Sequence, residues 1–291
     1  MTKVLVTGSN GQLGQSLQSI QSQFPDLSFV FLDRSQLDLS QLDAIQTVLS
    51  GYEFDVLINC AAYTAVDQAE SENELADKIN HQAVKELAKA TKRQAAKIIH
   101  ISTDYVFNGR AYKPYQETDK TDPQNVYGFT KWQGEQALLN HRPENAIVIR
   151  TSWVYSEFGH NFVKTMLRLG KERENLNVIF DQVGSPTYAK DLANAILQIV
   201  MHPTFQKPTI TSQIFHYANE GVCSWFDFAK AIFELSKYSC QVSPIETKDY
   251  PTPAVRPHYS VMNQTKIKRF YGLEIPYWRD ALKNGLKELE K

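Results

Sequence analysis

A tyrosine and a lysine four positions apart, Tyr127 and Lys131, are the pair of side chains with the clearest chemical use in this sequence. In a helix, positions i and i+4 project from the same face, so the phenol and the ammonium group can lie side by side. A Tyr hydroxyl normally loses its proton near pH ~10, but a neighbouring cation favours the phenolate and lowers its pKa. The pair therefore predicts a proton donor for a carbonyl group that is being reduced. An exposed helix can carry the same pattern by chance.

A glycine-rich turn near the N-terminus supports the functional interpretation. A predicted strand, Lys3–Thr7, runs into glycines spaced G-x-x-G-x-x-G, and a helical pattern over Gln12–Gln23 follows. Glycine lets the backbone approach a ligand, and the start of a helix directs free N–H groups at a pyrophosphate. In this strand–turn–helix context the motif predicts a dinucleotide site, although a tight turn without a ligand would look similar. The residues assigned to the cofactor are Gly8, Asn10, Gly11, Gln12, Leu13 and Gly14.

The end of the second predicted strand, Ser28–Asp33, bears on the choice of cofactor. A carboxylate such as Asp33 binds the ribose hydroxyls of NAD, whereas an arginine such as Arg34 accommodates the 2′-phosphate of NADP. The chain has both residues side by side, so the sequence predicts NADPH or NADH without choosing between them. Asp38 and Leu39, on a short extended piece, are assigned to the adenine edge, although a surface Asp before a helix would look the same.

Two further predicted strands end in small or polar residues. Phe54–Cys60 is followed by Ala61, Ala62 and Tyr63, which would let a nicotinamide ribose lie against the backbone. Lys97–Ser102 is followed by Thr103 and Asp104. In an open α/β sheet, ligands bind at the carboxyl ends of the strands. We therefore expect the Thr103 hydroxyl to hold the carbonyl oxygen that Tyr127 protonates, with a simple turn cap as the structural alternative.

The order of predicted elements indicates an α/β fold. Strands that are apolar throughout, the last over Ala146–Thr151, alternate with helical patterns, which include Gln41–Leu49, Glu74–Arg93 and Tyr127–Asn140. This alternation predicts a Rossmann-type, doubly wound parallel sheet. Beyond Thr151 the helical patterns near Asn161–Arg173, Tyr188–Met201, Trp225–Lys237 and Trp278–Leu289 are separated by Pro-bearing loops. We expect an NAD(P)-binding domain over residues 1–152 and a smaller, irregular, mainly substrate-binding lobe over 153–291. Part of 180–215 is expected to return to the first domain.

Composition narrows the functional classes. The 291 residues carry a formal net charge of -1, so no basic excess is present for binding nucleic acid. No apolar run reaches the ~18 residues of a membrane span, and a strand begins too early to leave room for a signal peptide. The three cysteines, Cys60, Cys223 and Cys240, form no C-x-x-C motif and predict free thiols in the cytoplasm.

Together these residues resemble the extended short-chain dehydrogenase/reductase family, which carries T-G-x-x-G-x-x-G, a hydroxyl residue at a strand end, and Y-x-x-x-K. Within that family the chain is similar to the branch of dTDP-4-dehydrorhamnose reductases, from Thr7 to about Asn263. The segments that carry this resemblance are NCAAYTAVDQAE at 59–70, ISTDYVFNG at 101–109, VYGFTKWQGE at 126–135, RTSWVY at 150–155, DQVGSPT at 181–187 and VRP at 255–257.

The resemblance implies a role for each matching residue. Tyr127 would protonate the C4 oxygen of a dTDP-sugar, and Lys131 would hold the nicotinamide ribose. The resemblance assigns the substrate to Thr64, Thr103, Asp104, Trp153, Asn161, Gln182 and Arg256, the last three for its nucleotide part. Guanidinium groups bind phosphate oxygens in bidentate fashion, which suits Arg256 to a diphosphate. The structural alternatives are a core Trp153 and an Arg256 paired with a surface acid.

One departure from the family concerns the oligomer. Some members form dimers through a metal ion held by acidic residues, one just after the glycine turn and one in the helix after G-x-P-T. Here those positions read Ser16 and Lys190. A divalent cation prefers carboxylate oxygens, and an ammonium group repels it. We therefore expect no metal site and a monomer or a weak homodimer.

Three functions remain open from the sequence. The leading interpretation is reduction of the C4 ketone of dTDP-4-dehydro-L-rhamnose by NAD(P)H. A second is a related nucleotide-sugar reductase or epimerase. A third is a non-catalytic regulatory subunit of methionine adenosyltransferase, a role to which a branch of the family has been put. Oxidation of the cofactor in the presence of the dTDP-4-keto sugar separates the enzymes from the subunit.

Overall fold

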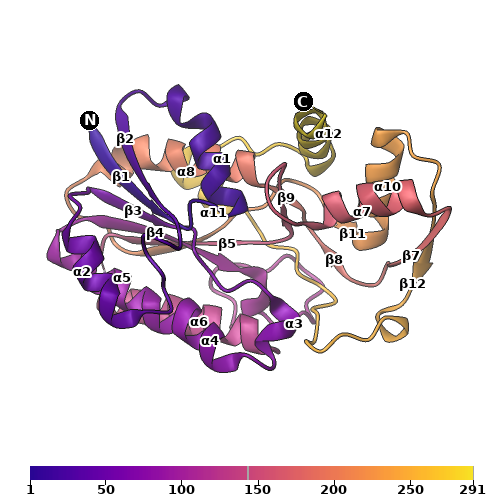
Figure 1. The fold of residues 1–291 in the computed structure, drawn as a ribbon, viewed down its shortest axis with the longest axis horizontal. Helices are drawn as coiled ribbons and strands as arrows, with labels where there is room; N and C mark the ends of the chain where they lie inside the picture. Colours follow the sequence, from indigo (N-terminus) through magenta and orange to yellow (C-terminus); the bar gives the residue numbers. More distant parts are fainter. Residues whose placement is uncertain (143, 291) are drawn as a thin grey trace.

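A six-stranded parallel sheet forms the centre of the larger lobe in the computed structural model, which describes residues 1–142 and 144–290 (Figure 1). Its strand order is β10-β5-β4-β3-β1-β2, so the chain moves outward in both directions from β1. The strands are β1 (Thr2–Thr7), β2 (Leu27–Leu32), β3 (Val56–Asn59), β4 (Lys97–Thr103), β5 (Ala146–Thr151) and β10 (Gln213–His216). The predicted Rossmann-type α/β fold is confirmed, and its topological switch point lies between β1 and β3.

Helices cover both faces of the sheet, as its apolar strands require. On one face lie α1 (Gln12–Ile20), α8 (Ala189–Met201) and α11 (Thr265–Tyr271), which share a core with Val4, Val6 and Ile149. On the other lie α2 (Leu42–Ser50), α5 (Ala83–Arg93) and α6 (Val126–His141), packed on Leu5, Leu57 and Val148. Alternate residues of each strand therefore serve opposite cores, and polar residues at the strand ends are carried on a rigid frame.

The helix expected over Glu74–Arg93 is interrupted. It consists of α4 (Asn73–Asp77), a π-helical turn η2 (Lys78–Gln82) and α5. Asn80 in this turn is buried, and its side chain binds both backbone groups of Tyr63: Oδ1 accepts from the N–H at 2.9 Å and Nδ2 donates to the carbonyl at 3.0 Å. The extra residue in the turn thus fixes the loop after β3, which explains why the helical pattern is broken here.

The smaller lobe is built from short strand pairs and three helices (Figure 1). Its strands pair as β7 (Asn175–Ile179) with β12 (Gln241–Ile245), β8 (Val183–Gly184) with β11 (Cys223–Ser224), and β6 (Val154–Tyr155) with β9 (Thr187–Tyr188). The helices are α7 (Phe162–Glu172), α10 (Trp225–Ser236) and α12 (Trp278–Leu289). Tyr155, Phe228 and Trp278 belong to the apolar core of this lobe.

The chain passes between the lobes more than once. After β9 it returns through α8 and the four-residue helix α9 (Pro203–Gln206) to β10, which pairs with β5. It returns again at α11, whose Ile267 and Tyr271 belong to the core on the α1 face. The remaining short elements are η1 (Gln21–Gln23), α3 (Val66–Ala69), η3 (Asp104–Val106) and η4 (Thr247–Asp249). Within the described residues, no helix has the length and apolar character needed to cross a membrane.

Candidate active site

The first turn of α6 positions Tyr127. Asn125 caps the helix, because its Oδ1 accepts a hydrogen bond from the Gly128 N–H at 2.7 Å. Its Nδ2 donates to the Val255 carbonyl at 2.8 Å, which joins the helix start to the loop after β12. The Tyr105 ring packs edge-on against Tyr127 with centroids 5.6 Å apart. Tyr127 is therefore held between the end of β4 and a loop of the smaller lobe.

The Thr103 side chain lies close enough to the Tyr127 phenol to lower its pKa, so the structure brings these two residues together, although the Thr103 hydroxyl itself donates to Asp104. Burial outweighs the effect of Thr103 and raises the pKa of Tyr127 to about 12. This differs from the expectation that Lys131 lowers the pKa. The reason is that the lysine ammonium turns toward β4, where Nζ donates to the Ile101 carbonyl at 2.6 Å. Tyr127 thus retains its proton at neutral pH, as a proton donor must.

Lys131 is 2% exposed, and burial lowers its pKa to about 8. The Glu135 carboxylate, one turn further along α6, opposes this shift. Besides the Ile101 carbonyl, Nζ lies 3.5 Å from Nε2 of His100 on β4. His100 was not predicted from the sequence, where a single histidine in an apolar strand gives no signal of its own.

Asp104 is a buried carboxyl group directly after β4. The Thr103 hydroxyl donates to its Oδ1 at 2.9 Å. Burial raises the pKa of Asp104 to about 7, against the lowering effect of the hydrogen bond from Thr103. The other carboxyl oxygen, Oδ2, is buried without a hydrogen-bond partner, and the Ser260 hydroxyl nearby donates to the Val183 carbonyl. Ser260 comes from the C-terminal part of the chain, so groups far apart in the sequence meet at this strand end.

The glycine turn is packed so tightly against neighbouring backbone that two of its positions admit no side chain. Gly8 has φ +68°, and a Cβ there would stand 2.7 Å from the Ala61 backbone. A Cβ on Gly14 would stand 2.4 Å from the Gly8 carbonyl oxygen. Gly11 caps α1 without any side-chain hydrogen bond to the N–H groups of the first turn. Those N–H groups can therefore serve an anion, as a pyrophosphate requires.

The residues assigned to the cofactor after β2 differ in whether their side chains are polar, as in Asp33, Arg34 and Asp38, or buried in the core, as in Leu39. Asp33 lies at the end of β2, where it accepts from Asn10 Nδ2 at 3.1 Å and from the Ser35 hydroxyl at 2.6 Å. Arg34 is exposed and donates through Nε to Asp38 at 3.2 Å. Leu39 is buried in the core on the α5 face, and Leu13 in the core on the α1 face, so only their backbones are available to a ligand. Asp38 is not part of a strand but directly precedes a turn, in which its carbonyl accepts from the Gln41 N–H at 3.0 Å.

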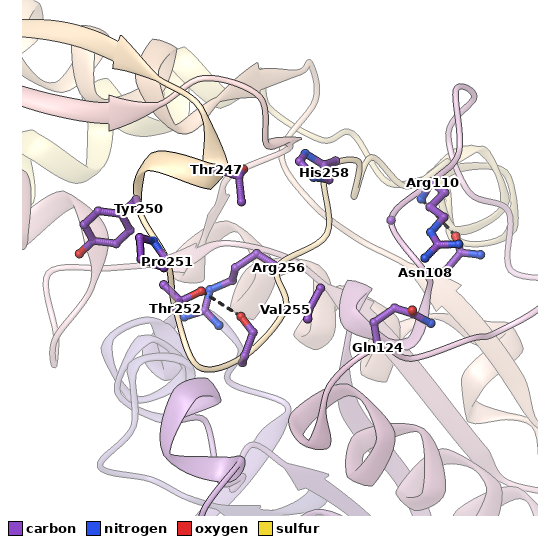
Figure 2. A pocket seen from close by; sticks show the side chains of 12 residues that line it. Asn108, Arg110, Gln124, Thr247, Tyr250, Pro251, Thr252, Val255, Arg256 and His258 are labelled. Atoms are coloured by element: carbon purple, nitrogen blue, oxygen red, sulfur yellow. Dashed lines mark hydrogen bonds between the residues drawn. The ribbon is translucent and has the colours of Figure 1, made fainter.

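A cavity of about 500 Å³ opens between the loop around Asn108–Arg110 and the segment from Thr247 to His258 (Figure 2). Arg256 lines it, and its Nη2 donates to Asp67 at 2.6 Å. Arg256 is therefore paired with an acidic side chain, which is the structural alternative that the sequence left open. However, its buried Nη1 has no partner in the structure and remains available to an acceptor. A smaller neighbouring pocket shares Arg256 and is also lined by Tyr105, which leads toward Tyr127.

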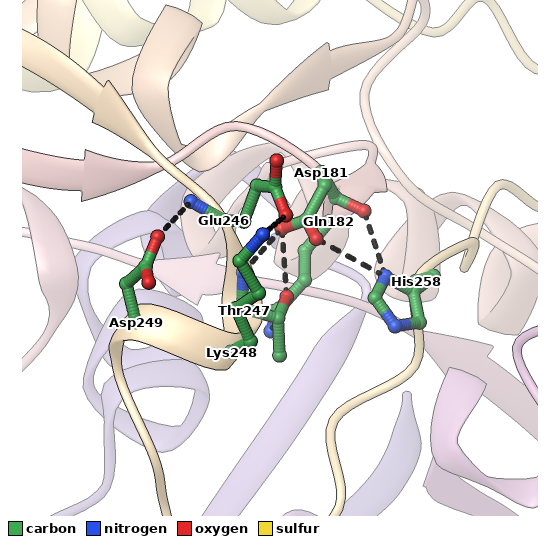
Figure 3. Close-up of polar contacts among 7 residues, drawn as sticks. All are labelled: Asp181, Gln182, Glu246, Thr247, Lys248, Asp249 and His258. Carbon is green, nitrogen blue, oxygen red and sulfur yellow. Dashed lines mark hydrogen bonds and ion pairs between the residues drawn. The ribbon is translucent and has the colours of Figure 1, made fainter.

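Gln182 does not line the cavity itself but contacts Thr247, which does. Its Nε2 donates to the Thr247 hydroxyl at 3.1 Å, and Thr247 donates its own hydroxyl and N–H to Asp181 (Figure 3). His258 Nδ1 lies 3.7 Å from Asp181 Oδ2. Gln182 is therefore buried in a polar group that shapes the cavity wall.

The structure does not bring Trp153, Asn161 and Thr64 to this cavity. Trp153 has φ +50° and stacks on Trp225 with centroids 3.6 Å apart. Asn161 caps α7 and donates through Nδ2 to Gln12 at 2.9 Å, so it faces the glycine turn. Thr64 is exposed. A Cβ on Gly184 would stand 2.6 Å from Ser260 Oγ and 2.8 Å from the Trp153 ring. Trp153 and Ser260 therefore both lie beside Gly184, and Ser260 is in turn near Asp104.

The two positions considered for a metal differ in their surroundings. Ser16 is fully buried and donates to the Gln12 carbonyl at 2.8 Å. Lys190 Nζ lies 3.7 Å from Glu288 Oε1. Across residues 1–142 and 144–290, no cluster of three or more His, Cys, Asp or Glu side chains could hold a metal ion.

Comparison with known proteins gives a consistent match over the whole length. The family model described as RmlD substrate binding domain matches residues 1–291. A dTDP-4-dehydrorhamnose reductase of Aggregatibacter actinomycetemcomitans is 42% identical over 98% of both chains. A solved structure of a Clostridium acetobutylicum dTDP-4-dehydrorhamnose reductase superposes with a TM-score of 0.92, at 38% identity over 99% of this chain and 100% of the other. The Bacillus anthracis reductase, solved in complex with NADP, gives 0.91 at 39% identity over 99% of each chain.

Proposed function

The chain belongs to the RmlD substrate binding domain family, and on this basis we propose that it reduces the C4 ketone of dTDP-4-dehydro-L-rhamnose to dTDP-L-rhamnose with NAD(P)H. The observation that carries the proposal is the arrangement of Tyr127 in the first turn of α6, beside Thr103 at the carboxyl end of β4, with Lys131 one turn further along the helix and bound to the Ile101 carbonyl of the same strand. This strand end lies on the side of the sheet where the glycine turn follows β1.

Bound NAD(P)H supplies a hydride to the C4 carbon of the ketone. Tyr127 gives its proton to the C4 oxygen, so that one hydride and one proton together make the alcohol. The Thr103 hydroxyl holds the same oxygen, and Lys131 orients the ribose of the cofactor. Asp104 contacts the sugar, and the phenolate left on Tyr127 takes a proton from solvent to complete the cycle. None of these steps requires a metal ion.

The cavity lined by Arg256 suits the nucleotide part of the substrate. Its volume of about 500 Å³ is within the range of small-molecule sites. Arg110 and Arg256 contribute positive charge, and the unpartnered Nη1 of Arg256 can donate to a phosphate oxygen. We assign the diphosphate to this cavity. For Trp153 we propose a contact with the sugar. For Asn161, which faces the glycine turn, we propose a contact with the substrate on its cofactor side.

We propose that each lobe mainly binds a different ligand. Residues 1–152, with the returning part of 180–215, bind the cofactor, and 153–291 mainly bind the substrate. Both NADH and NADPH serve, because Asp33 favours the ribose hydroxyls and exposed Arg34 a 2′-phosphate. The free thiols of Cys60, Cys223 and Cys240 suit a cytoplasmic protein. We infer a monomer or a weak homodimer.

The test is cofactor oxidation with the dTDP-4-keto sugar, comparing the parent with Tyr127→Phe. Phenylalanine keeps the ring but removes the proton, so kcat should fall by about 10²–10⁴-fold, the usual worth of a general acid. The Kd for NADPH should stay within a few-fold of the parent value. Tyr52→Phe, at the opposite end of the sheet between α2 and β3, is the matched control and should keep full activity.

Two outcomes would redirect the proposal. A parent protein that binds NADPH but turns over neither this sugar nor related nucleotide sugars would favour the regulatory-subunit alternative. Turnover of a different nucleotide sugar at a higher kcat/KM would favour a related reductase or epimerase. Near-parental turnover by Tyr127→Phe would remove Tyr127 from the role of acid.

A further inference from the structure

A row of polar side chains crosses the sheet beneath α6. Thr7 on β1, Asn59 on β3 and His100 on β4 are register partners on three adjacent parallel strands, so their side chains share one face. All three are at most 1% exposed. Polar residues are uncommon at such positions, and a buried polar group costs stability unless it is hydrogen-bonded. Of the three, only His100 has appeared in the site described so far, as a neighbour of the Lys131 amino group.

The hydrogen bonds along this row run in one direction. The Thr7 hydroxyl donates to Asn59 Oδ1 at 2.6 Å, which leaves the Asn59 Nδ2 to donate to His100 Nδ1 at 2.9 Å. Burial and the nearby Lys131 keep the pKa of His100 well below its usual value, so the imidazole is neutral and carries one proton. Because Nδ1 accepts, that proton is on Nε2, the atom that faces Lys131 Nζ at 3.5 Å.

An Nε2–H group directed at a lysine nitrogen favours the neutral amine, whose lone pair can accept it, over the ammonium ion, which cannot. The other titratable groups near Nζ are Glu135 on α6 and Cys60 after β3, and Tyr127 lies one turn away on the same helix. Glu135 acts in the opposite sense, because a carboxylate favours the ammonium ion. Lys131 is thus held between one group that favours the amine and one that favours the ion.

We propose that His100 is a positioning residue for Lys131: its neutral imidazole, fixed by Asn59 and Thr7, sets where the lysine amino group lies and how readily it loses its proton. The row therefore ties the lysine mechanically to the strand that enters the glycine turn, since Thr7 is the last residue of β1. The inference rests on the proposed function, in which Lys131 orients the cofactor.

Two substitutions separate the two ends of the imidazole. The amide of asparagine ends as many bonds from Cα as Nδ1, and that of glutamine as many as Nε2. His100→Asn should keep the contact with Asn59 and lose that with Lys131, whereas His100→Gln keeps a polar group beside the lysine. His216→Asn, at an equally buried histidine on β10, is the matched control for the loss of a core imidazole. The readouts are kcat, NADPH affinity and the pH dependence of kcat.

For His100→Asn we expect kcat to fall roughly 10-fold, because misplacing a group that orients the reactants slows the reaction. The alkaline limb of the pH dependence of kcat should move to higher pH by about one unit, because the loss of one net hydrogen bond shifts a pKa by about that much. His100→Gln should recover kcat to within a few-fold of the parent. His216→Asn should keep the parental pH profile. Variants of His100 that lower stability while kcat and the alkaline limb stay parental would show a purely structural role and overturn the proposal.

A measurement on the parent protein covers the case in which the variants fail to fold. In ¹⁵N-histidine NMR spectra, His100 should carry its proton on Nε2 and should not titrate between pH 6 and 9. A proton on Nδ1, or titration in this range, would contradict the proposal. If the parent turns over no dTDP-sugar, the proposed function fails, while this spectrum still decides whether the hydrogen-bonded row exists.

Discussion

Asp104 is a buried acid whose environment favours its neutral form. Burial raises its pKa from the usual 3.8 to about 7, because few groups nearby compensate a negative charge. Between pH ~4 and ~7 the folded protein keeps this proton while the unfolded chain has lost it. The folded state therefore binds more protons, and the contribution of Asp104 to the free energy of unfolding decreases as pH rises through this window.

From this we predict that Asp104→Asn gains stability relative to the parent as pH rises. The amide is isosteric and its Oδ1 can still accept from the Thr103 hydroxyl, but it cannot become charged. The difference in free energy of unfolding, variant minus parent, should increase by on the order of 2–4 kcal/mol between pH 5 and pH 8, since one pKa unit corresponds to about 1.4 kcal/mol. Urea denaturation at both pH values measures it. An unchanged difference would mean that Asp104 is ionised in the fold at both values.

Individual residues also show what sequence patterns can predict. Tyr127, Lys131 and Thr103 could be proposed from the sequence because a fixed spacing or a strand end marks them, and their catalytic roles stay a prediction. Asn80 and His100 were missed, because each is a lone polar residue in an otherwise regular helix or strand. Their importance comes from partners 17 and 41 positions away, Tyr63 and Asn59. The effect of Lys131 on Tyr127 was also misjudged, because spacing cannot tell where a flexible lysine points.

Helix α6 is fastened to the sheet by a buried ion pair. Arg150 on β5 donates through Nε and Nη2 to the two carboxylate oxygens of Glu135, at 2.9 and 2.7 Å. Glu135 is 0% and Arg150 2% exposed. The Ser102 hydroxyl on β4 donates to the same carboxylate at 2.5 Å. Because Glu135 lies one turn after Lys131, these contacts hold the part of α6 that carries Lys131 against β4 and β5.

We predict that Glu135→Gln destabilises the protein by about 3–5 kcal/mol, because it leaves the Arg150 charge buried without a counter-charge. Replacing both partners, Glu135→Met with Arg150→Met, should recover much of that loss, since two apolar side chains remove both buried charges. Urea denaturation of the two variants gives both values. Equal losses in the single and double variants would show that the pair contributes through packing rather than through its charges.

The elements were predicted well where they are long and apolar. The five strands and the helices around them in the first half agree with the expected ranges within a few residues. Strand β10 was missed, because Gln213–His216 has four residues and becomes a strand only by pairing with β5. The same holds for β7 and β12, which pair across more than sixty intervening positions. Periodicity is a local signal and carries no information about such pairing.

The two lobes meet at the glycine turn through a single side chain. Gln12, the first residue of α1, accepts at Oε1 from Ser156 and Asn161, at 3.0 and 2.9 Å, and donates through Nε2 to the Val154 carbonyl at 3.3 Å. These partners all lie in the segment that leaves β5 for the smaller lobe. The glycine turn is therefore hydrogen-bonded directly to the connection between the lobes. The sequence assigned Gln12 and Asn161 to different ligands and could not show that they contact each other.

The last prediction belongs to the scale of the whole molecule and concerns metal ions. At one position considered for a bridging ion, Ser16 is buried and bound to the Gln12 carbonyl. At the other, the Lys190 ammonium lies against Glu288 and repels a cation. EDTA should therefore leave the initial rate and the mass in solution unchanged.

Lys190→Glu is the matched variant, because it places a second carboxylate beside Glu288. It should lose stability through repulsion, and Mg²⁺ should restore that stability and promote association, since hard cations prefer carboxylate oxygens. Thermal unfolding and light scattering with and without Mg²⁺ measure both effects. Loss of parental activity in EDTA that Mg²⁺ reverses, or an EDTA-sensitive parental dimer, would show that other acidic residues bind an ion in the assembled protein.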